Sequence, residues 1–491
     1  MPQPYDQPII DVAHYVFHYQ IPDTEQAVWK CARVALLDAI GCAIETAAIS
    51  RECRALLGPV VAGTVVPNGF RVPGTELQVD PLKGAFDLGV LIRYLDHNDA
   101  LGGAEWGHPS DNLAAILATM DWLSRASVFG KDDNGPPLTI KTLLVALIKA
   151  YEIQGCYQMR NAFNVYGIDH VVLVKLAATT VVSWLVGLTE NQTRAAISHV
   201  WMDGHPTRVY RSGANTIPRK GWAAGDAARR AVQLALLVRA GQPGAPGALT
   251  TSRWGFLERT FGEAGFELPR SFETWTIQNV LFKVMPVEGH GIAAVEAALV
   301  QHRALQQKGL SDPTNHIQRV VLRTTAAADL IINKTGPLQN SADRDHCIQY
   351  VVALAFLKGC APEAPDYAND SQWASSKELE HLRSQMEVYP DAKLTQDYLD
   401  WDKMSIGSGV TIHLDDGSSL SEVLIEYPIG HVRNPKTSPA VQAKFAKNMR
   451  HMFSEAEVAR ISKAAEDDDM RIMDFVDLLV RPAPSSPHPR L

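Results

Sequence analysis

The chain has 491 residues, of which 46% are hydrophobic and 20% charged, and its formal net charge at pH 7 is −8. This composition is typical of a compact globular protein and excludes a largely disordered chain. The acidic balance, without a basic stripe between aromatic residues, argues against nucleic acid as a partner. At this length we expect two domains, or one large domain with an insertion.

The six cysteines are widely spaced and lie mostly in apolar runs, so they predict buried, reduced thiols rather than a zinc site or an iron–sulfur cluster. The longest apolar stretch, at 171–188, contains Lys175 and several hydroxyl side chains and therefore predicts a buried helix rather than a membrane span. The N-terminal segment resembles neither a signal peptide nor a mitochondrial presequence. We therefore expect an intracellular protein with no metal site and no membrane partner.

The first part of the chain, to about residue 240, has the pattern of successive helices. Apolar residues recur at helical spacing from 24 to 48 and again at 112–126, 139–158, 171–188, 190–203 and 221–240. Glycine, proline and polar residues separate these segments, as in FGKDDNGPP at 129–137. Many of the helices are rich in alanine and apolar on most faces, so we expect them to pack closely in several layers.

After about residue 275 the pattern changes. The segment 316–328 alternates like a strand, and 408–430 has two alternating runs around Asp415-Asp416-Gly417, which predicts a β-hairpin. Further helices are expected at 288–307, 344–358 and 376–386, and helical spacing returns at 438–480.

These patterns predict a mainly α protein with an α+β insertion. A large helical domain would be built from both chain ends, 1–272 and 432–491, and a smaller α+β lid domain from 273–431. The Pro/Ser-rich tail at 482–491 is expected to be disordered.

Titratable groups concentrate in one glycine-containing loop, LDHNDALGGAEWGHPSDN at 95–112. Its candidate functional side chains are Asp96, Asp99, Glu105, His108 and Ser110. A simpler interpretation is a solvated loop whose Ser110 and Asp111 cap the next helix, but a cap would not need the other acids. The glycines let the backbone approach a ligand, the helix N-terminus offers N–H groups to an anion, and His108 can carry a proton.

Four later segments share this form, with histidine, lysine or arginine in a loop at a helix start. They hold His170 (164–175), then Arg211, Arg219 and Lys220 (208–231), then Lys283, Gly289 and His290 (280–299), and finally Arg344, His346 and Tyr350 (340–356). Each signal is weak alone, because such histidines are usually structural and such basic runs are usually solvated. Together they suit binding of a small polyanion and proton abstraction next to a carboxylate, where cations stabilise the developing charge.

Seven segments carry a resemblance to a known family: PNGFRVPGTELQVDP, LDHND, AEWGHPSDN, GIDHVVLVK, RKGWAAGDA, GPLQNSADRDHCIQY and EYPIGH. They closely resemble the 2-methylcitrate dehydratases of the MmgE/PrpD family, from near residue 10 to near 480. The resemblance implies a helical domain, a smaller lid domain, a homodimer, and an interdomain cleft in which a citrate-like tricarboxylate loses water without metal or organic cofactor. It places Asp96, His108, His170, Lys220, Lys283 and His290 on the family's active-site motifs.

Under this hypothesis Lys220, Lys283 and helix N-termini hold the substrate's carboxylates. Either His108 or His170 takes the proton from the carbon that bears the alkyl group, and an acid from the same set protonates the leaving hydroxyl. Asp96 would orient one imidazole and tune its pKa. The candidates for substrate binding are Asp99, Glu105, Ser110, Arg211, Arg219, Gly289, Arg344, His346 and Tyr350.

Small residues stand where dehydratases of this family tend to carry bulky ones. Gly102 and Gly103 follow LDHND, and Gly289 and Gly291 flank His290. If these glycines line the position of the substituent, they make room for an alkyl chain longer than methyl, which would indicate a biosynthetic pathway for long-chain alkylcitrates rather than propionate breakdown. The alternative is that they are loop hinges without substrate contact.

Two other functions are kept as hypotheses. One is an aconitate-type decarboxylase of the same family, and the other is a non-catalytic binding protein on this fold, against which the retained acids, histidines and lysines argue. The last three residues, Pro489-Arg490-Leu491, approximate the Ser-Lys-Leu peroxisomal address, so we expect the protein in the cytoplasm or the peroxisome.

Overall fold

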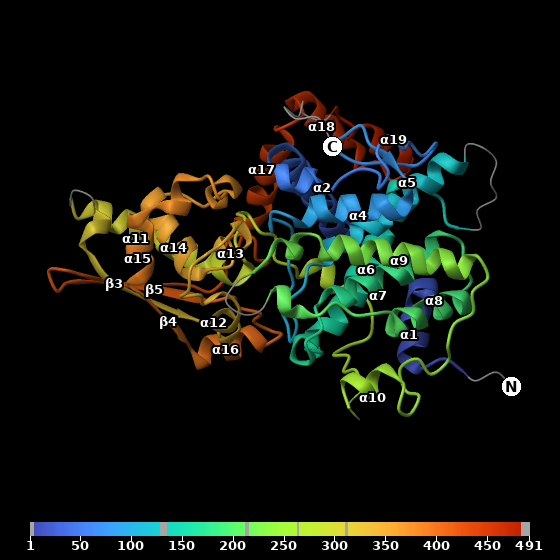
Figure 1. Ribbon diagram of the computed structural model, residues 1–491, viewed down its shortest axis with the longest axis horizontal. Helices are drawn as coiled ribbons and strands as arrows, with labels where there is room; N and C mark the ends of the chain where they lie inside the picture. Colours follow the sequence, from blue (N-terminus) through green and yellow to red (C-terminus); the bar gives the residue numbers. More distant parts are fainter. Residues whose placement is uncertain (1–3, 128–134, 212–215, 263–264, 310–312, 483–491) are drawn as a thin grey trace.

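A larger helical body and a smaller α+β domain lie side by side in the computed structural model, which describes residues 4–127, 135–211, 216–262, 265–309 and 313–482 (Figure 1). This two-domain, mainly α architecture is the one that the sequence predicts. No helix within the described ranges is both long and apolar enough to cross a membrane. The predicted tail, with Pro489-Arg490-Leu491, lies outside the described residues from 483 onward.

The helical body contains α1 (Gln7–His18), α2 (Gln26–Ile49), α3 (Arg51–Arg54), α4 (Pro81–Arg93), α5 (Leu113–Ser127), α6 (Ile140–Arg160), α7 (Val171–Leu185), α8 (Glu190–Met202), α9 (Ala223–Arg239) and α10 (Phe256–Thr260), with the two-stranded β1 (Phe70–Arg71) and β2 (Gln78–Val79). Three C-terminal helices return to this body: α17 (Thr437–Met449), α18 (Glu455–Ala464) and α19 (Ile472–Asp477). In Figure 1, α17 lies beside α2 and α19 beside α5, so the two ends of the chain share one body.

The most apolar helix, α7, lies at the centre of the body. It packs against α6, α8 and α9, and its side chains from 171 to 183 are all buried. Some of its polar side chains have partners and others do not: the Thr180 hydroxyl donates to the Leu176 carbonyl at 2.9 Å, whereas the buried hydroxyls of Thr179 and Ser183 have no hydrogen-bond partner among the described residues. The prediction of a buried helix for this stretch is therefore confirmed.

Helices α4 and α9 cross at two glycines, and this crossing positions the candidate site. A Cβ on Gly89 would lie 2.5 Å from the Cα of Gly225, so only glycine allows the two backbones to approach this closely. Helix α4 begins at Pro81, capped by Asp80, whose side chain accepts from two backbone N–H groups. Because α4 ends at Arg93 and Lys220 lies in the short turn just before α9, the crossing brings these two segments together.

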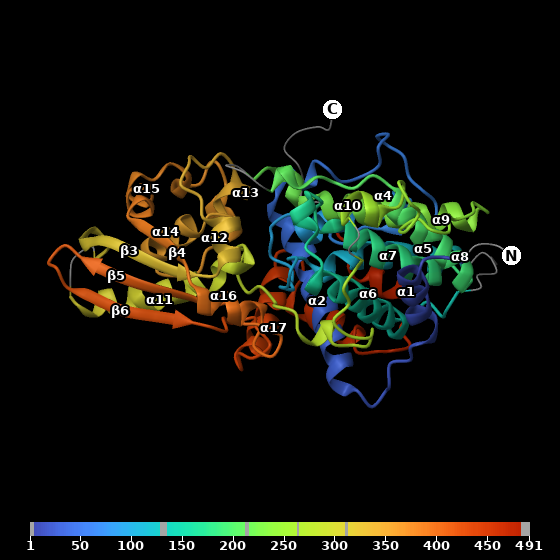
Figure 2. The same ribbon diagram turned by 90° about the horizontal axis from the view of Figure 1, so that it is seen from below.

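The smaller domain is a four-stranded sheet covered by helices. Its strands are β3 (Ile317–Thr324), β4 (Met386–Pro390), β5 (Ser408–Leu414) and β6 (Ser419–Ile425), in the order β4-β3-β5-β6, with only the β3–β4 pair parallel. Its helices are α11 (Ile292–Gln307), α12 (Ala326–Ile332), α13 (Ser341–Arg344), α14 (Ile348–Lys358), α15 (Lys377–Ser384) and α16 (Ala392–Leu399). Helix α11 packs on β5 and β6, and α14 packs on α11 and α15 (Figure 2).

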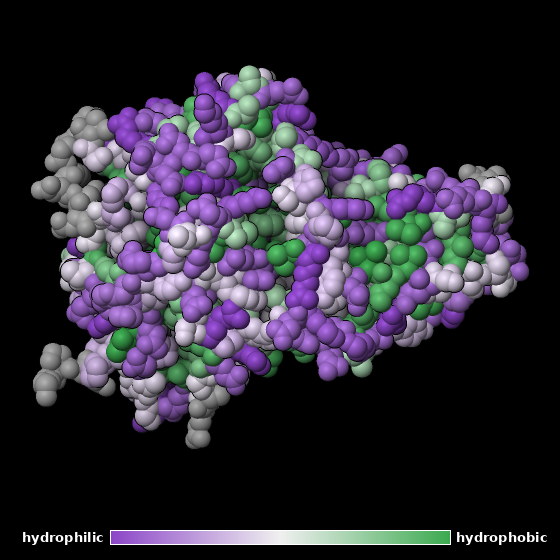
Figure 3. Space-filling view, turned by 180° about the vertical axis from the view of Figure 1, so that it is seen from behind, coloured by the Kyte–Doolittle hydropathy of each residue, from purple (hydrophilic) through white to green (hydrophobic). Residues whose placement is uncertain are grey.

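The hairpin predicted around Asp415-Asp416-Gly417 is confirmed as β5–β6. The strand predicted at 316–328 ends earlier, at Thr324, because the Thr325 hydroxyl accepts from the N–H of Ala328 and begins α12. The helix predicted from 344 begins at Ile348, since the short α13 precedes it. Polar side chains cover most of the face seen in Figure 3, with apolar patches on the smaller domain.

Candidate active site

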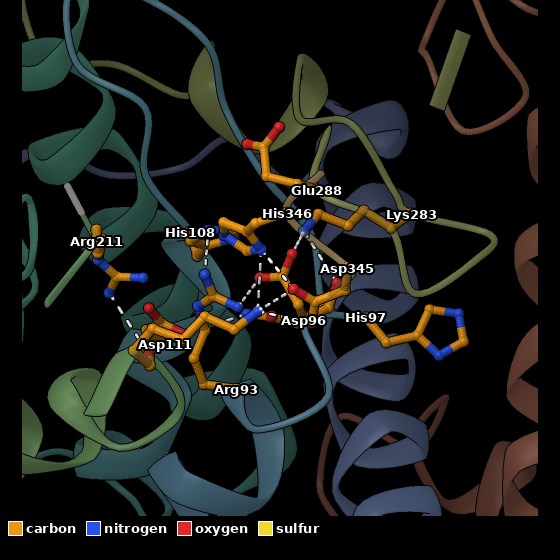
Figure 4. A network of polar contacts seen from close by, with 12 residues as sticks. Arg93, Asp96, His97, His108, Asp111, Arg211, Lys283, Glu288, Asp345 and His346 are labelled. Carbon is orange, nitrogen blue, oxygen red and sulfur yellow. Dashed lines mark hydrogen bonds and ion pairs between the residues drawn. The ribbon is translucent and has the colours of Figure 1, made fainter. Parts of the chain in front are cut away.

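The loop that follows α4 forms the centre of the candidate site. Asp96 has a φ of +55°, in the left-handed region that aspartate tolerates better than most residues. Its carboxylate contacts Nη1 of Arg93 and lies 2.7 Å from Nζ of Lys283, which also donates to the Asp96 carbonyl at 2.9 Å (Figure 4). Lys283 therefore binds both the side chain and the backbone of Asp96 and fixes this turn.

The electrostatics of this centre follow from burial and nearby cations. Burial alone would raise the pKa of Asp96, but Arg93, Lys220 and Lys283 hold it well below its ordinary value. Burial lowers the pKa of Lys283, against the opposing effect of Asp96. Asp96 is therefore ionised, and Lys283 is a cation that loses its proton more readily than an exposed lysine does.

His108 is held as a neutral imidazole. Its Nδ1 lies 2.6 Å from the carbonyl oxygen of Asp99, which can only accept, so Nδ1 carries the proton. Its Nε2 lies 2.8 Å from Nη2 of Arg93 and accepts from it. Burial, Arg93 and Lys283 lower the pKa of His108 well below its usual range. Both ring nitrogens are therefore occupied, and His108 orients Arg93.

His170 differs because neither of its buried ring nitrogens has a hydrogen-bond partner. It stands just before α7, and its ring centroid is 5.6 Å from that of His108. Oδ1 of Asp169 lies 3.5 Å from its Nδ1, while Oδ2 of the same carboxylate accepts from Nε of Arg211 at 2.7 Å. Burial lowers the pKa of His170 well below its usual range. His170 is thus a neutral base whose partner is absent from the described residues.

An ion pair joins the two domains at the edge of this cluster. Lys220, from the segment before α9, donates to both carboxylate oxygens of Asp345, at 2.9 and 2.8 Å. Asp345 follows α13 of the smaller domain, and Nδ1 of the adjacent His346 lies 2.5 Å from its Oδ1. An open pocket lined by Tyr94, Lys220, Asp345 and Tyr367 reaches this pair from solvent. We call it the Lys220 pocket.

His290 lies on another side of the cluster, paired with Glu288. Both oxygens of the Glu288 carboxylate are 3.1 Å from Nδ1 of His290, and Nε2 lies 3.3 Å from the Tyr398 hydroxyl. Burial alone would raise the pKa of Glu288, but His290 and His346 lower it to about 2. The Trp106 ring packs on His290 with centroids 4.2 Å apart.

The side chains of Asp99 and Ser110 are engaged by other protein groups and hold the segment whose carbonyl binds His108. Ser110 donates to Oδ1 of Asp99 from its N–H at 3.1 Å and from its hydroxyl at 2.6 Å, while Tyr151 donates to Oδ2 at 2.7 Å. The interpretation of Ser110 and Asp111 as helix caps is wrong, since both are buried in a short 3-10 turn that precedes α5.

Several sequence candidates lie apart from the cluster. Glu105 is paired with Arg208 at 3.4 Å, Arg219 stacks on the Trp222 ring at 4.1 Å, and Arg344 donates to the Tyr367 carbonyl and to Asn369, both at 2.8 Å. Tyr350 is buried with its hydroxyl unpartnered, and its ring is 6.3 Å from that of Tyr367.

The expectation that Gly289 and Gly291 leave open space is wrong. A Cβ on Gly289 would lie 2.1 Å from Cζ2 of Trp106, so the indole ring already fills that position. Beside Gly291 stand the side chains of Val287 and Ile332, at 3.1 and 3.5 Å from such a Cβ.

Arg93, Glu288 and Asp345 were missed by the sequence analysis. Each had a signal: Arg93 is a lone charge in the apolar run LGVLIRYL, Glu288 is two residues before His290, and Asp345 precedes His346. A charge within an apolar run indicates a buried, paired group. Which partner each would find depended on the packing of the two domains.

The comparisons with known proteins agree with this architecture. A family model described as the MmgE/PrpD N-terminal domain matches residues 10–269, and one described as the MmgE/PrpD C-terminal domain matches 285–469. The chain therefore belongs to the MmgE/PrpD family, and the predicted resemblance is confirmed.

Curated proteins similar over nearly the whole chain are dehydratases by name. "Alkylcitrate dehydratase phiI" of Fungal sp. (strain ATCC 74256) is 61% identical over 489 residues, 99% of this chain and 96% of that protein. The protein of the same name from Talaromyces stipitatus is 57% identical, covering 97% of each chain. The 2-methylcitrate dehydratase of Salmonella typhimurium is 44% identical, covering 97% of this chain and 98% of that protein.

Proposed function

We propose that this protein is an alkylcitrate dehydratase, a hydro-lyase that removes water from a 2-alkylcitrate to give a 2-alkyl-aconitate. Two relatives of more than half identity that carry this name support the reaction and the substrate class. The structural observation that carries the mechanism is His170, a buried neutral imidazole without a partner beside a cluster of cations.

The substrate is a trianion, and the cluster offers cations that can bind its carboxylates. Lys283 points toward Asp96 at the centre of the cluster (Figure 4). Lys220 is paired with Asp345, and Arg211 binds Asp169. Each is paired with a carboxylate of the protein, so a substrate carboxylate would replace one already present. Held this way, the hydrogen-bearing carbon is oriented toward a base.

In the reaction His170 takes the proton from the carbon that bears the alkyl group, and the electron pair of that C–H bond forms the double bond as the neighbouring C–O bond breaks. The nearby ammonium groups stabilise the charge that develops on the adjacent carboxylate. Lys283 gives the departing hydroxyl its proton, because burial lowers the pKa of its ammonium group. The products are a 2-alkyl-aconitate and water.

The test is to incubate EDTA-dialysed protein with 2-methylcitrate and with longer 2-alkylcitrates, and to follow the unsaturated product by absorbance and mass. Loss of 18 mass units without release of carbon dioxide is the expected result for a dehydratase. Release of carbon dioxide from an aconitate-like acid would instead establish the decarboxylase. Tight binding without turnover would establish a binding protein.

A homodimer and a location in the cytoplasm or peroxisome complete the proposal. The dimer is supported by the family resemblance, and light scattering on the purified protein would measure its mass. A fusion that keeps the C-terminus free, followed by microscopy in a fungal cell, would show whether Pro489-Arg490-Leu491 acts as an address.

A further inference from the structure

Two histidines and a glutamate come together on the surface of the helical body, outside the active-site cluster. His14 and His18 belong to α1, and Glu190 is the first residue of α8. Each offers one atom that can bind a metal ion, and these three atoms all lie within 4.8 Å of one another. We call this group the His14 cluster. Imidazole and carboxylate are the side chains that bind zinc in proteins.

The geometry of α1 places both imidazole rings on one face of the helix. Residues four apart in a helix lie one turn apart on the same face, and the ring centroids of His14 and His18 are 4.3 Å apart. Both side chains are more than half exposed, at 64% for His14 and 54% for His18. An ion can therefore reach the ring nitrogens directly from solvent.

The carboxylate of Glu190 is held in place by its own helix. Thr189 caps α8, and its side chain accepts from the N–H of Gln192, which fixes the first turn. Arg194, one turn further along α8, forms an ion pair with the Glu190 carboxylate through Oε1. Carboxylates that bind a metal commonly have an outer partner of this kind, which sets the direction of the remaining lone pairs.

The distances within the His14 cluster fit a tetrahedral ion. Nε2 of His18 lies 2.8 Å from Oε2 of Glu190, and Nδ1 of His14 lies 3.9 Å from Oε1. Tetrahedral zinc, with bonds of about 2.0–2.2 Å, separates its ligand atoms by about 3.3 Å. The two distances lie on either side of this value, so small rotations of exposed side chains would admit the ion. The solvent side leaves the fourth position to water.

The donor atoms favour zinc over the alkaline-earth ions. Two imidazole nitrogens with one carboxylate suit Zn²⁺, whereas Mg²⁺ and Ca²⁺ take oxygen ligands. The sequence predicted no metal site because Glu190 stands 172 residues from His18, and only the packing of α1 on α8 brings them together. Figures 1 and 2 show these helices side by side at the end of the helical body away from the smaller domain.

We propose that His14, His18 and Glu190 bind one Zn²⁺ ion, with water as the fourth ligand, and that the ion ties α1 to α8. With three protein ligands and an open side, the bound ion exchanges with solvent. Both helices pack against α7, so the ion stabilises the packing around this central helix. The site shares no residue with the active-site cluster and takes no part in the removal of water.

The experiment titrates Zn²⁺ into EDTA-dialysed protein by isothermal titration calorimetry, in the wild type, in His18→Gln and in a matched control, His316→Gln. His316 is also an exposed histidine beside a carboxylate, with its Nδ1 3.0 Å from Oδ2 of Asp415. His18→Gln is expected to weaken the binding of one equivalent by at least about tenfold, and His316→Gln to leave it unchanged. Zn²⁺ at about 100 times its Kd should raise the Tm of the wild type by about 2–4 °C, and Mg²⁺ should not.

Three results would overturn the proposal. Equal affinity and stoichiometry for Zn²⁺ in the wild type and in His18→Gln would show that the cluster binds no ion. An equal loss in His316→Gln would show that exposed histidines bind Zn²⁺ without a built site. An unchanged affinity in Glu190→Gln, which keeps the size of the side chain and removes its charge, would exclude the third ligand. None of these measurements uses an alkylcitrate, so their results do not depend on the proposed function.

Discussion

At the scale of single residues, His108 and His170 differ in what their ring nitrogens contact. His108 has both ring nitrogens occupied, by Arg93 and by the Asp99 carbonyl, whereas His170 has neither. A general base needs a free lone pair and a neutral ring, and only His170 has both.

We therefore expect His170→Asn to lower kcat by about 10²- to 10⁴-fold with little change in KM, since it removes proton transfer and leaves the cations that bind the carboxylates. Steady-state kinetics with a 2-alkylcitrate would measure this, with circular dichroism as the check on folding. A variant whose KM rises while kcat stays constant would show that His170 binds substrate and does not take the proton.

Asp111 gives a prediction about stability and pH. Burial raises its pKa from 3.8 to about 7, and its Oδ2 has no hydrogen-bond partner. A carboxyl with a raised pKa in the folded state stabilises the protein when protonated. That contribution is complete below pH 3.8 and is lost as the pH rises through about 7.

Relative to Asp111→Asn, which does not titrate, the wild type should lose about 3 kcal/mol of unfolding free energy between pH 5 and pH 8. Urea unfolding of both proteins at several pH values measures the difference in their unfolding free energies. Because the two proteins share all other titrating groups, the contributions of those groups largely cancel in this difference. A difference that stays constant over this range contradicts the assignment.

At the scale of secondary-structure elements, one buried lysine connects α17, α2 and the active-site loop. Lys444 of α17 forms an ion pair with Asp38 of α2 at 2.8 Å and donates to the His97 carbonyl at 2.6 Å. His97 is itself fixed by Glu45 of α2, at 2.7 Å from its Nδ1. Because His97 follows Asp96, this group also holds the left-handed turn of Asp96, in addition to Lys283.

Replacing Lys444 with methionine should cost about 3–5 kcal/mol of unfolding free energy, because it leaves Asp38 buried without a partner. It should also lower kcat, since the loop that carries Asp96 loses one anchor. The matched control is the double variant Asp38→Leu/Lys444→Met, in which the stability should largely return but the kcat should not. If kcat returned as well, Lys444 would act on stability alone.

The sequence predicted elements better than it predicted contacts. The buried helix at 171–188 and the hairpin at 408–430 were recognisable because apolar spacing and an Asp-Gly turn are local properties. The filling of the space beside Gly289 by Trp106 was not, because it brings together residues far apart in the chain. The position of Arg93 between Asp96 and His108 likewise requires the turn at Asp96, which no local pattern specifies.

The distinction between local sequence pattern and tertiary contact applies to the candidate site as well. Asp96, His108, His170, Lys220 and Lys283 were recognisable as a set because each stands in a loop next to a helix start, and the structure brings them together. Arg219 and Arg344 had the same signal, yet they pack on an indole ring and on a loop of the smaller domain. The composition of a segment indicates that a cation is present, while the direction of its side chain depends on the tertiary fold.

At the scale of the whole molecule, the pair of Lys220 and Asp345 is one of the polar links that join the domains at the site, together with the pair of Lys283 and Asp96. Both side chains are buried, and both oxygens of Asp345 accept from the same ammonium. A substrate carboxylate that binds Lys220 must displace Asp345 from it, so the protein's own acid competes with the ligand.

Asp345→Asn should therefore bind tricarballylate, a tricarboxylate without the reactive hydroxyl, about tenfold more tightly than the wild type. The reason is that one charged hydrogen bond, worth about 1.5 kcal/mol, no longer has to be broken first. Lys220→Met, which removes the shared ammonium, should bind it more weakly than the wild type. Isothermal titration calorimetry at fixed ionic strength measures both, because screening by salt would otherwise change the result. Weaker binding by Asp345→Asn would show that Asp345 positions Lys220 for the ligand, so that closure of the two domains would assist binding instead of opposing it.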